Sequence, residues 1–172
     1  MRLFLSMLMV SALIFGCSGD DKSTTDEEQS PAADNKNTVS SQQAAPDTLA
    51  NGEPKFIEVQ HILISFQGRG TKATRSQSEA QLLAIEVLAK AQSGEDFDEL
   101  VKQYTDDAFP GRYKMTNLGV PPNPALGMAY PRDQMVPAFG NVGFKLEIGE
   151  IGMSNYDVRT SPYGWHIIKR LQ

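Results

Sequence analysis

The chain has 172 residues, and its 16 basic and 21 acidic side chains give a formal net charge of −5. This length suits one domain with additional segments. The acidic balance argues against a nucleic-acid-binding protein, and the single cysteine, Cys17, excludes an intrachain disulfide.

The N-terminus carries the features of a secretory signal. Arg2 precedes an uncharged apolar run that ends at Gly16, and this run is shorter than the roughly 20 residues that cross a bilayer. We therefore interpret residues 1–16 as a signal peptide.

The cysteine that follows resembles a bacterial lipobox, so we expect Cys17 to be acylated and to anchor the protein to a membrane. An ordinary signal peptide followed by an incidental cysteine is the alternative. Ser18 is similar to the residue that directs Gram-negative lipoproteins to the outer membrane. We therefore expect a cell-envelope protein that faces the periplasm, or otherwise lies on an extracytoplasmic membrane face.

A polar segment continues to residue 55. Eight acids and three bases lie in residues 18–55, where Val39 and Leu49 are nearly the only large apolar side chains. Such a segment cannot bury enough apolar surface to offset the entropy of ordering. We therefore expect residues 17–55 to be a lipidated, disordered, acidic tether, and residues 56–172, with 13 acids and 12 bases, to be the folded domain.

A strand and two helices are predicted at the start of the domain. Residues 56–64 are rich in branched side chains that partly alternate with polar ones, which indicates a strand, and residues 67–75 form a loop. Ser76 and Glu79 then have the capping-box spacing, and Gly94 is placed to end the helix. Its apolar residues recur at helical intervals: Ala80, Leu83, Ala84, Val87, Leu88 and Ala91.

Asp96 and Glu99 repeat the cap spacing before a shorter helix, with Phe97, Leu100, Val101 and Tyr104 on its apolar face. Residues 106–131 contain five prolines and three glycines, which predicts a loop, with a short edge strand over residues 114–118. A helix over residues 134–144 and strands over residues 150–154 and 164–171 complete the domain. This order predicts an α+β fold with a mostly antiparallel sheet and helices packed against it.

Seven short segments, spread in order over the whole domain, match one known family. They are Val59–Ile64, Ser93–Leu100, Tyr104–Asp107, Asn117–Gly119, Asp133–Phe139, Leu146–Ile151 and Ser161–Ile168. Together they resemble the parvulin-type peptidyl-prolyl cis/trans isomerases. The resemblance implies an FKBP-like fold, in which short helices surround a four-stranded, mostly antiparallel sheet. The loop over residues 119–134 is longer than in compact parvulins, which bears on substrate preference.

The resemblance also implies a set of site residues. His61 and His166 would lie side by side in the sheet, linked through the hydroxyl of Ser161, or of Thr160 if the register differs by one. Asp107 would lie near the substrate carbonyl. Taken singly, each histidine is typical of a core residue in an apolar strand, and Asp107 is typical of a turn.

The proline ring would be held by an apolar slot formed by Leu118, Met135 and Phe139. Met135 and Phe139 are four residues apart, so we expect them to share one face of the predicted helix. If Asp107 is partly buried, its pKa should rise, and activity should fall as the pH drops through that value. The bases Arg69, Lys72 and Arg75 form a solvated loop or, alternatively, favour an acidic residue before proline.

The implied activity is isomerisation of X–Pro bonds in exported proteins, by holding the proline and twisting the amide without covalent chemistry. We expect no cofactor, no metal and no nucleic acid; the expected partners are proline-containing polypeptides, and the protein is expected to be a monomer. A proline-peptide-binding chaperone with little turnover is the alternative. A lipoprotein that only displays a globular domain is a third possibility, and it predicts neither activity nor proline-dependent binding.

Overall fold

A computed structural model of the protein describes residues 47–172. The expected signal peptide, the lipid anchor at Cys17 and the tether as far as residue 46 lie outside the described residues.

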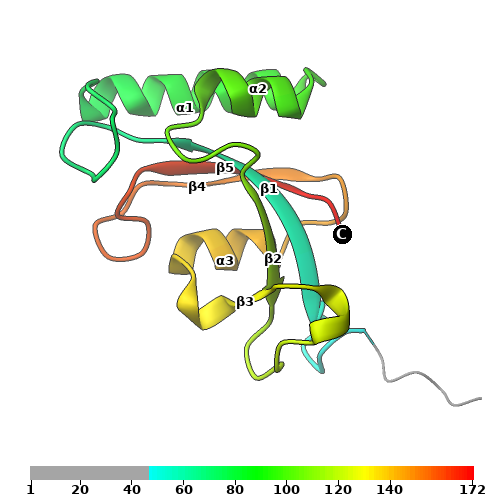
Figure 1. Ribbon diagram of the computed structural model, residues 1–172. Helices are drawn as coiled ribbons and strands as arrows, with labels where there is room; N and C mark the ends of the chain where they lie inside the picture. The colour runs from blue at the N-terminus through cyan, green and yellow to red at the C-terminus, as the bar shows by residue number, and fades with distance from the viewer. Residues whose placement is uncertain (1–46) are drawn as a thin grey trace, which may run out of the picture. The chain divides into compact units, whose positions relative to one another are not determined.

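A five-stranded sheet forms the centre of the domain (Figure 1). The strands are β1 (Phe56–Ile64), β2 (Arg112–Thr116), β3 (Tyr130–Pro131), β4 (Ile151–Ser154) and β5 (Trp165–Arg170). Their order is β3-β2-β1-β5-β4, and all neighbours are antiparallel except β2 and β3. The expected α+β class is confirmed, but the sheet has one strand more than the four expected. The additional strand, β3, arises because the 119–134 loop returns alongside β2.

The helices agree with their sequence signals where those signals are local. They are α1 (Gln77–Gln92), α2 (Phe97–Tyr104) and α3 (Pro137–Gly143), with short 3-10 turns η1 (Pro124–Leu126) and η2 (Arg132–Gln134). Ser76 and Glu79 form the predicted capping box, and Gly94, with φ of +96°, follows the end of α1. Asp96 caps α2 by accepting a hydrogen bond from Glu99 N.

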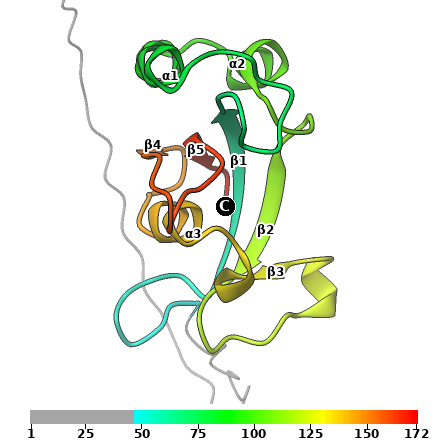
Figure 2. The same ribbon diagram turned by 90° about the vertical axis from the view of Figure 1, so that its left-hand side faces the viewer.

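Helices cover both faces of the sheet (Figures 1 and 2). α1 and α2 pack on one face, where Ile62, Ile64 and Trp165 contribute to the core, and α3 packs on the other face against Ile57, Val59 and Ile168. Because side chains alternate along a strand, His61 on β1 and His166 on β5 lie on the α3 face. The fold thus brings two histidines that are 105 positions apart to the same side of the sheet.

Residues 47–55 belong to the folded part of the chain, although their composition predicted a tether. Thr48 and Pro54 form an isolated β-bridge. The carboxylate of Glu53 accepts hydrogen bonds from Arg132 Nη1 at 2.8 Å and Asn117 Nδ2 at 3.1 Å. These contacts are made with residues far along the chain, so local composition could not reveal them.

Candidate functional site

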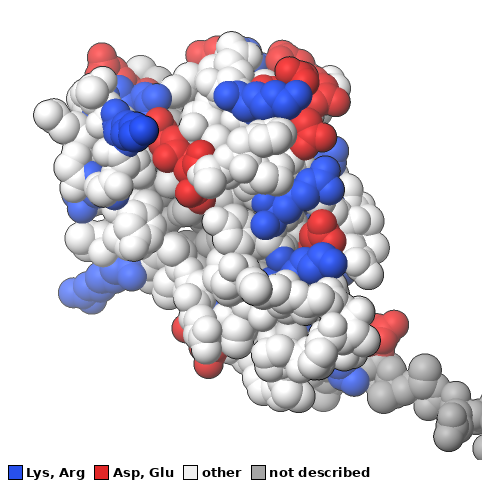
Figure 3. All heavy atoms as spheres, in the orientation of Figure 1, with Lys and Arg blue, Asp and Glu red and all other residues white. Residues whose placement is uncertain are grey.

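A cavity of about 300 Å³ opens between the sheet and α3. Its lining includes five of the residues that the sequence pointed to, namely His61, Asp107, Met135, Phe139 and His166. Figure 3 shows a hollow in this face of the molecule, with acidic atoms on one side and uncharged residues on the other. The volume lies at the lower end of the range for small-ligand pockets.

The two imidazoles contact each other directly at the floor of the cavity. His61 Nδ1 lies 3.1 Å from His166 Nδ1, and the stacked rings have centroids 5.3 Å apart. Both side chains are buried. The pairing of β1 with β5, in which Leu63 is opposite His166, fixes this arrangement. The structure therefore places the two histidines side by side, as the resemblance implied.

The contact between the imidazoles restricts their protonation. One Nδ1 must donate and the other must accept. His61 Nε2 lies 3.2 Å from Asp107 Oδ2, too poorly aligned for a hydrogen bond, so this contact is mainly electrostatic. The two rings therefore share a single hydrogen bond between their Nδ1 atoms, while His61 Nε2 faces the carboxylate of Asp107.

Asp107 lies at the mouth of the cavity beside His61. Contact with the His61 imidazole is the largest of several effects that lower the pKa of Asp107 to about 2, whereas partial burial acts in the opposite direction. The hydroxyl of Tyr113 also donates to Asp107 Oδ2, at 3.3 Å. The expectation that burial raises the pKa of Asp107 is therefore wrong, because its hydrogen-bonding and charged neighbours outweigh desolvation.

His166 has the opposite electrostatic character. Burial, and then the neighbouring His61, lower the pKa of His166 to about 3, although the Asp107 charge opposes this shift. The imidazole of His166 is therefore neutral at pH 7. His166 therefore adds no charge of its own to the floor of the cavity.

The shifted pKa of His166 makes stability depend on pH. Below a pH of about 6.5 the unfolded chain protonates this histidine, whereas the folded chain excludes the proton until about pH 3. The free energy of unfolding should therefore fall by about 2 kcal/mol between pH 6.5 and pH 4.5 from this group alone. Urea unfolding of the protein and of His166→Asn at both pH values measures the difference. An equal pH dependence in the two proteins would contradict this account.

Three side chains form the apolar walls. Phe139 on α3 packs edge-on against His61, with ring centroids 5.1 Å apart, and Tyr113 on β2 lies 5.8 Å from Phe139. Met135 also lines the cavity. It precedes α3 in an extended conformation, with φ of −92° and ψ of 164°. Met135 and Phe139 therefore reach the same cavity without sharing the helix face that their spacing predicted, because α3 begins only at Pro137.

Leu118 does not belong to the slot, contrary to the expectation. It is 56% exposed and is absent from the cavity lining. β2 ends at Thr116, and a turn through Asn117 and Gly119, with φ of +73°, carries Leu118 outward. Tyr113 takes its place as the third wall.

The hydroxyl link between the histidines was also assigned wrongly. Ser161 is buried, and its hydroxyl donates to the carbonyl of Gly164 at 2.8 Å. The alternative, Thr160, donates its hydroxyl to Asp157 at 3.0 Å. Since the imidazoles bond directly to each other, no hydroxyl is required between them, and Ser161 instead stabilises the turn that leads into β5.

Besides Tyr113, five residues that line the cavity were not predicted from the sequence. They are Leu63, Gly70, Thr71, Val136 and Tyr163. Val136 follows Met135 directly, Leu63 lies two positions after His61, and Tyr163 lies in a segment that carried the resemblance. Gly70 and Thr71 come from the basic loop, and only the folded structure brings that loop to the cavity.

The three bases of that loop have different environments. The guanidinium of Arg69 stacks over Phe66 and Tyr156, at 4.7 and 5.1 Å from their ring centroids. Arg75 pairs with Asp106 and donates to the carbonyl of Ser65 at 2.8 Å. Lys72 is exposed. The expectation of three solvated bases therefore holds only for Lys72.

The Arg75 pair gives a prediction about stability. Arg75→Ala leaves the carboxylate of Asp106 and the carbonyl of Ser65 without this donor, in a partly buried place. We expect the free energy of unfolding to fall by about 1–3 kcal/mol. Lys72→Ala, from the same loop, should change it by less than about 0.5 kcal/mol. Chemical denaturation of both variants is the measurement, and equal losses would show that the pair has no structural role.

Two structural findings concern other kinds of site, and both are limited to residues 47–172. No helix there is both long and apolar enough to cross a membrane. No group of three or more His, Cys, Asp or Glu side chains in the same range is arranged to hold a metal ion.

Comparison with known proteins identifies the family of the domain. Residues 47–172 match the sequence profile of the PPIC-type PPIASE domain. The chain is 33% identical over 125 residues to the chaperone SurA of Chromohalobacter salexigens, a match that covers 69% of this chain and 24% of that protein. It is 40% identical over 86 residues to the foldase protein PrsA of Geobacillus kaustophilus, covering 50% and 26% of the two chains. The chain thus spans about a quarter of the length of these curated relatives.

The solution structure of TbPIN1 has a similar fold, with a TM-score of 0.51 at 20% identity over 69% of this chain and 98% of that one. At this identity the likeness concerns the fold alone. The match of the PPIC-type domain, by contrast, covers every residue that the structure describes. The protein therefore belongs to the parvulin-type rotamases, the family of the PPIC-type peptidyl-prolyl isomerase domain.

Proposed function

We propose that the protein is a peptidyl-prolyl cis/trans isomerase that acts on X–Pro bonds of exported polypeptides. The observation that carries the proposal is the cavity itself, in which apolar walls stand over two imidazoles in contact. Rotation about a peptide bond is opposed by a barrier of about 18–20 kcal/mol. A site lowers it by holding the twisted amide better than the planar one.

Each wall of the cavity has a role in this proposal. Met135, Phe139 and Tyr113 hold the proline ring and exclude water. Asp107, which is ionised at neutral pH, lies beside His61 and would face the carbonyl of a bound substrate. The neutral His166 supports His61 from below. No bond is broken, since the reaction changes only a dihedral angle.

The rate of cis/trans exchange of a prolyl peptide tests the proposed activity. Two-dimensional exchange NMR on an Ala-Pro peptide, with the full chain at a substoichiometric level, should show cis/trans exchange well above the uncatalysed rate. Met135→Ala should lower kcat/KM roughly tenfold, because the ring loses apolar contact. Met153→Ala is the matched control, since Met153 packs on the opposite face of the sheet. Exchange at the uncatalysed rate would refute the activity.

A proline-peptide-binding chaperone with little turnover is the second candidate. It is favoured by the exposed apolar side chains of the 119–134 loop, among them Met128 at 79% exposure. This candidate predicts peptide binding at the cavity without faster exchange.

The remaining proposals concern the environment of the protein and its partners. We propose that Cys17, outside the described residues, is acylated and holds the protein in the cell envelope, where unfolded exported polypeptides are its partners. Radiolabelled palmitate should then label the protein but not the variant Cys17→Ser.

We also propose that Lys72, which lies next to Thr71 at the cavity, favours an acidic residue before proline. Equal turnover of Glu-Pro and Ala-Pro peptides would exclude that preference.

A further inference from the structure

The 119–134 loop presents apolar side chains to solvent next to the cavity. Met128 is 79% exposed, and Tyr130 is 41% exposed. Large apolar side chains gathered in this way commonly mark an interaction site. Their position decides what they could bind.

Contacts at two points fix this loop to the domain. Arg132 Nη1 donates to Glu53 and Asn117 at 2.8 and 2.7 Å, and its guanidinium lies 4.8 Å from the centroid of Phe144. Lys114 Nζ donates to the carbonyl of Leu126 at 3.2 Å. These contacts hold the loop on both sides of Met128 and Tyr130, which reduces the backbone entropy lost on binding.

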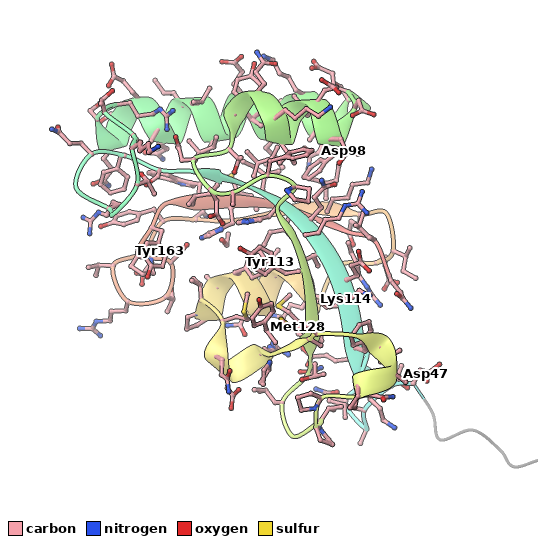
Figure 4. The ribbon with its side chains drawn as sticks, viewed as in Figure 1. Asp47, Asp98, Tyr113, Lys114, Met128 and Tyr163 are labelled. Carbon is pink, nitrogen blue, oxygen red and sulfur yellow. The ribbon has the colours of Figure 1, made fainter. Side chains whose placement is uncertain are left out.

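The apolar side chains continue the wall of the cavity. Tyr130 on β3 lies beside Tyr113 on β2, with ring centroids 6.0 Å apart, and Tyr113 lines the cavity. In the view of Figure 4, Tyr163 lies to the left of Tyr113, and Met128 lies below Tyr113. An extended chain advances about 3.3 Å per residue. A polypeptide with its proline in the cavity would thus bring a side chain about two residues away to Tyr130.

The charges nearby favour an uncharged occupant. The charged side chain that bonds to the loop just before Met128 is Lys114, and its ammonium group is already bonded to Leu126 O and 3.9 Å from Glu58. Across the cavity mouth lies the carboxylate of Asp107. An acidic side chain would gain no free cation here, whereas an apolar one would be removed from water.

We propose that Met128 and Tyr130 form a subsite that binds a large apolar side chain of the substrate polypeptide, about two residues from the proline. This inference rests on the proposed function insofar as the cavity must take the proline. Such a subsite would make the protein selective for segments that combine proline with apolar residues. Unfolded polypeptides expose segments of this kind.

Three capped peptides test the subsite with the full chain. All three contain a central Ala-Pro. The first has Phe two residues before the proline, the second has Phe two residues after it, and the third has Gly at both positions. NMR titration gives the dissociation constants, and exchange NMR gives turnover separately. We expect one Phe peptide to bind roughly tenfold more tightly than the Gly peptide. The double variant Met128→Ser, Tyr130→Ser should remove this preference, whereas Leu82→Ser, which changes an exposed apolar residue on α1, should keep it.

The outcomes separate the two proposals. Turnover of all three peptides with equal affinities would overturn the subsite and leave the isomerase standing. A preference that persists in the double variant, with an unchanged unfolding midpoint, would also overturn the subsite. Binding with the preference, lost in the double variant but without any turnover, would support the subsite and refute the isomerase.

Discussion

Replacing Asp107 with asparagine is expected to lower kcat/KM for an Ala-Pro peptide roughly 10- to 100-fold. The carboxylate lies 3.2 Å from His61 and accepts a hydrogen bond from Tyr113. An amide lacks the charge and presents donors in place of one acceptor, so it cannot keep the same contacts to both neighbours. Exchange NMR measures the loss, and Asp133→Asn, an exposed acid on η2, is the matched control.

The same variant shows how the carboxyl titrates. Since the pKa of Asp107 is lowered to about 2, the group stays ionised at every pH from 4 to 8. The ratio of wild-type to Asp107→Asn activity should therefore be constant over this range. A ratio that falls toward one below pH 5 would mean that the carboxyl becomes protonated there, and that its pKa is raised.

Replacing Gly164 with alanine is expected to reduce the free energy of unfolding by at least about 3 kcal/mol. Gly164 has φ of +145°, and an added Cβ would lie 2.2 Å from the carbonyl oxygen of Ile64. The start of β5 would have to move away from β1, which would also displace His166. Urea denaturation measures the loss.

Gly149→Ala separates the clash from the backbone conformation. Gly149 also has a positive φ, of +85°, but an added Cβ would meet nothing within 4 Å. We expect a loss of about 1–2 kcal/mol there, from the left-handed conformation alone. Equal losses at the two positions would mean that the close approach of β5 to β1 has no energetic consequence.

Local sequence signals predicted the regular elements well. The first strand has the bounds that its residues indicated, and the capping box of Ser76 and Glu79 begins α1. Both signals involve residues within a few positions of one another. β2 lies two residues earlier than its sequence indicated, because its limits depend on pairing with β1 across 52 to 60 positions.

The displaced strand explains the error in the slot. With β2 placed at residues 112–116, Tyr113 and Met115 lie on the α3 face, and Leu118 falls in the turn beyond the strand. The resemblance located the histidines and the Met135–Phe139 segment correctly, because these residues lie within short segments that match the family. It could not locate a wall residue whose position depends on where a strand ends.

The remaining errors concern interactions between distant residues. The sign of the pKa shift of Asp107 depends on whether burial or neighbours prevail, and His61 is 46 positions away in the chain. Similarly, Glu53 is held by Arg132, 79 positions away. The composition of the segment predicted that Glu53 would be solvated, because composition contains no information about partners so far along the chain.

The position of a bound proline tests the central claim most directly. Intermolecular NOEs can be measured on the full chain in the presence of an Ala-Pro peptide. We expect NOEs from the proline ring protons to the ε-methyl of Met135 and the ring of Phe139. NOEs confined to other surfaces, such as the groove near Val120 and Ile148, would contradict it.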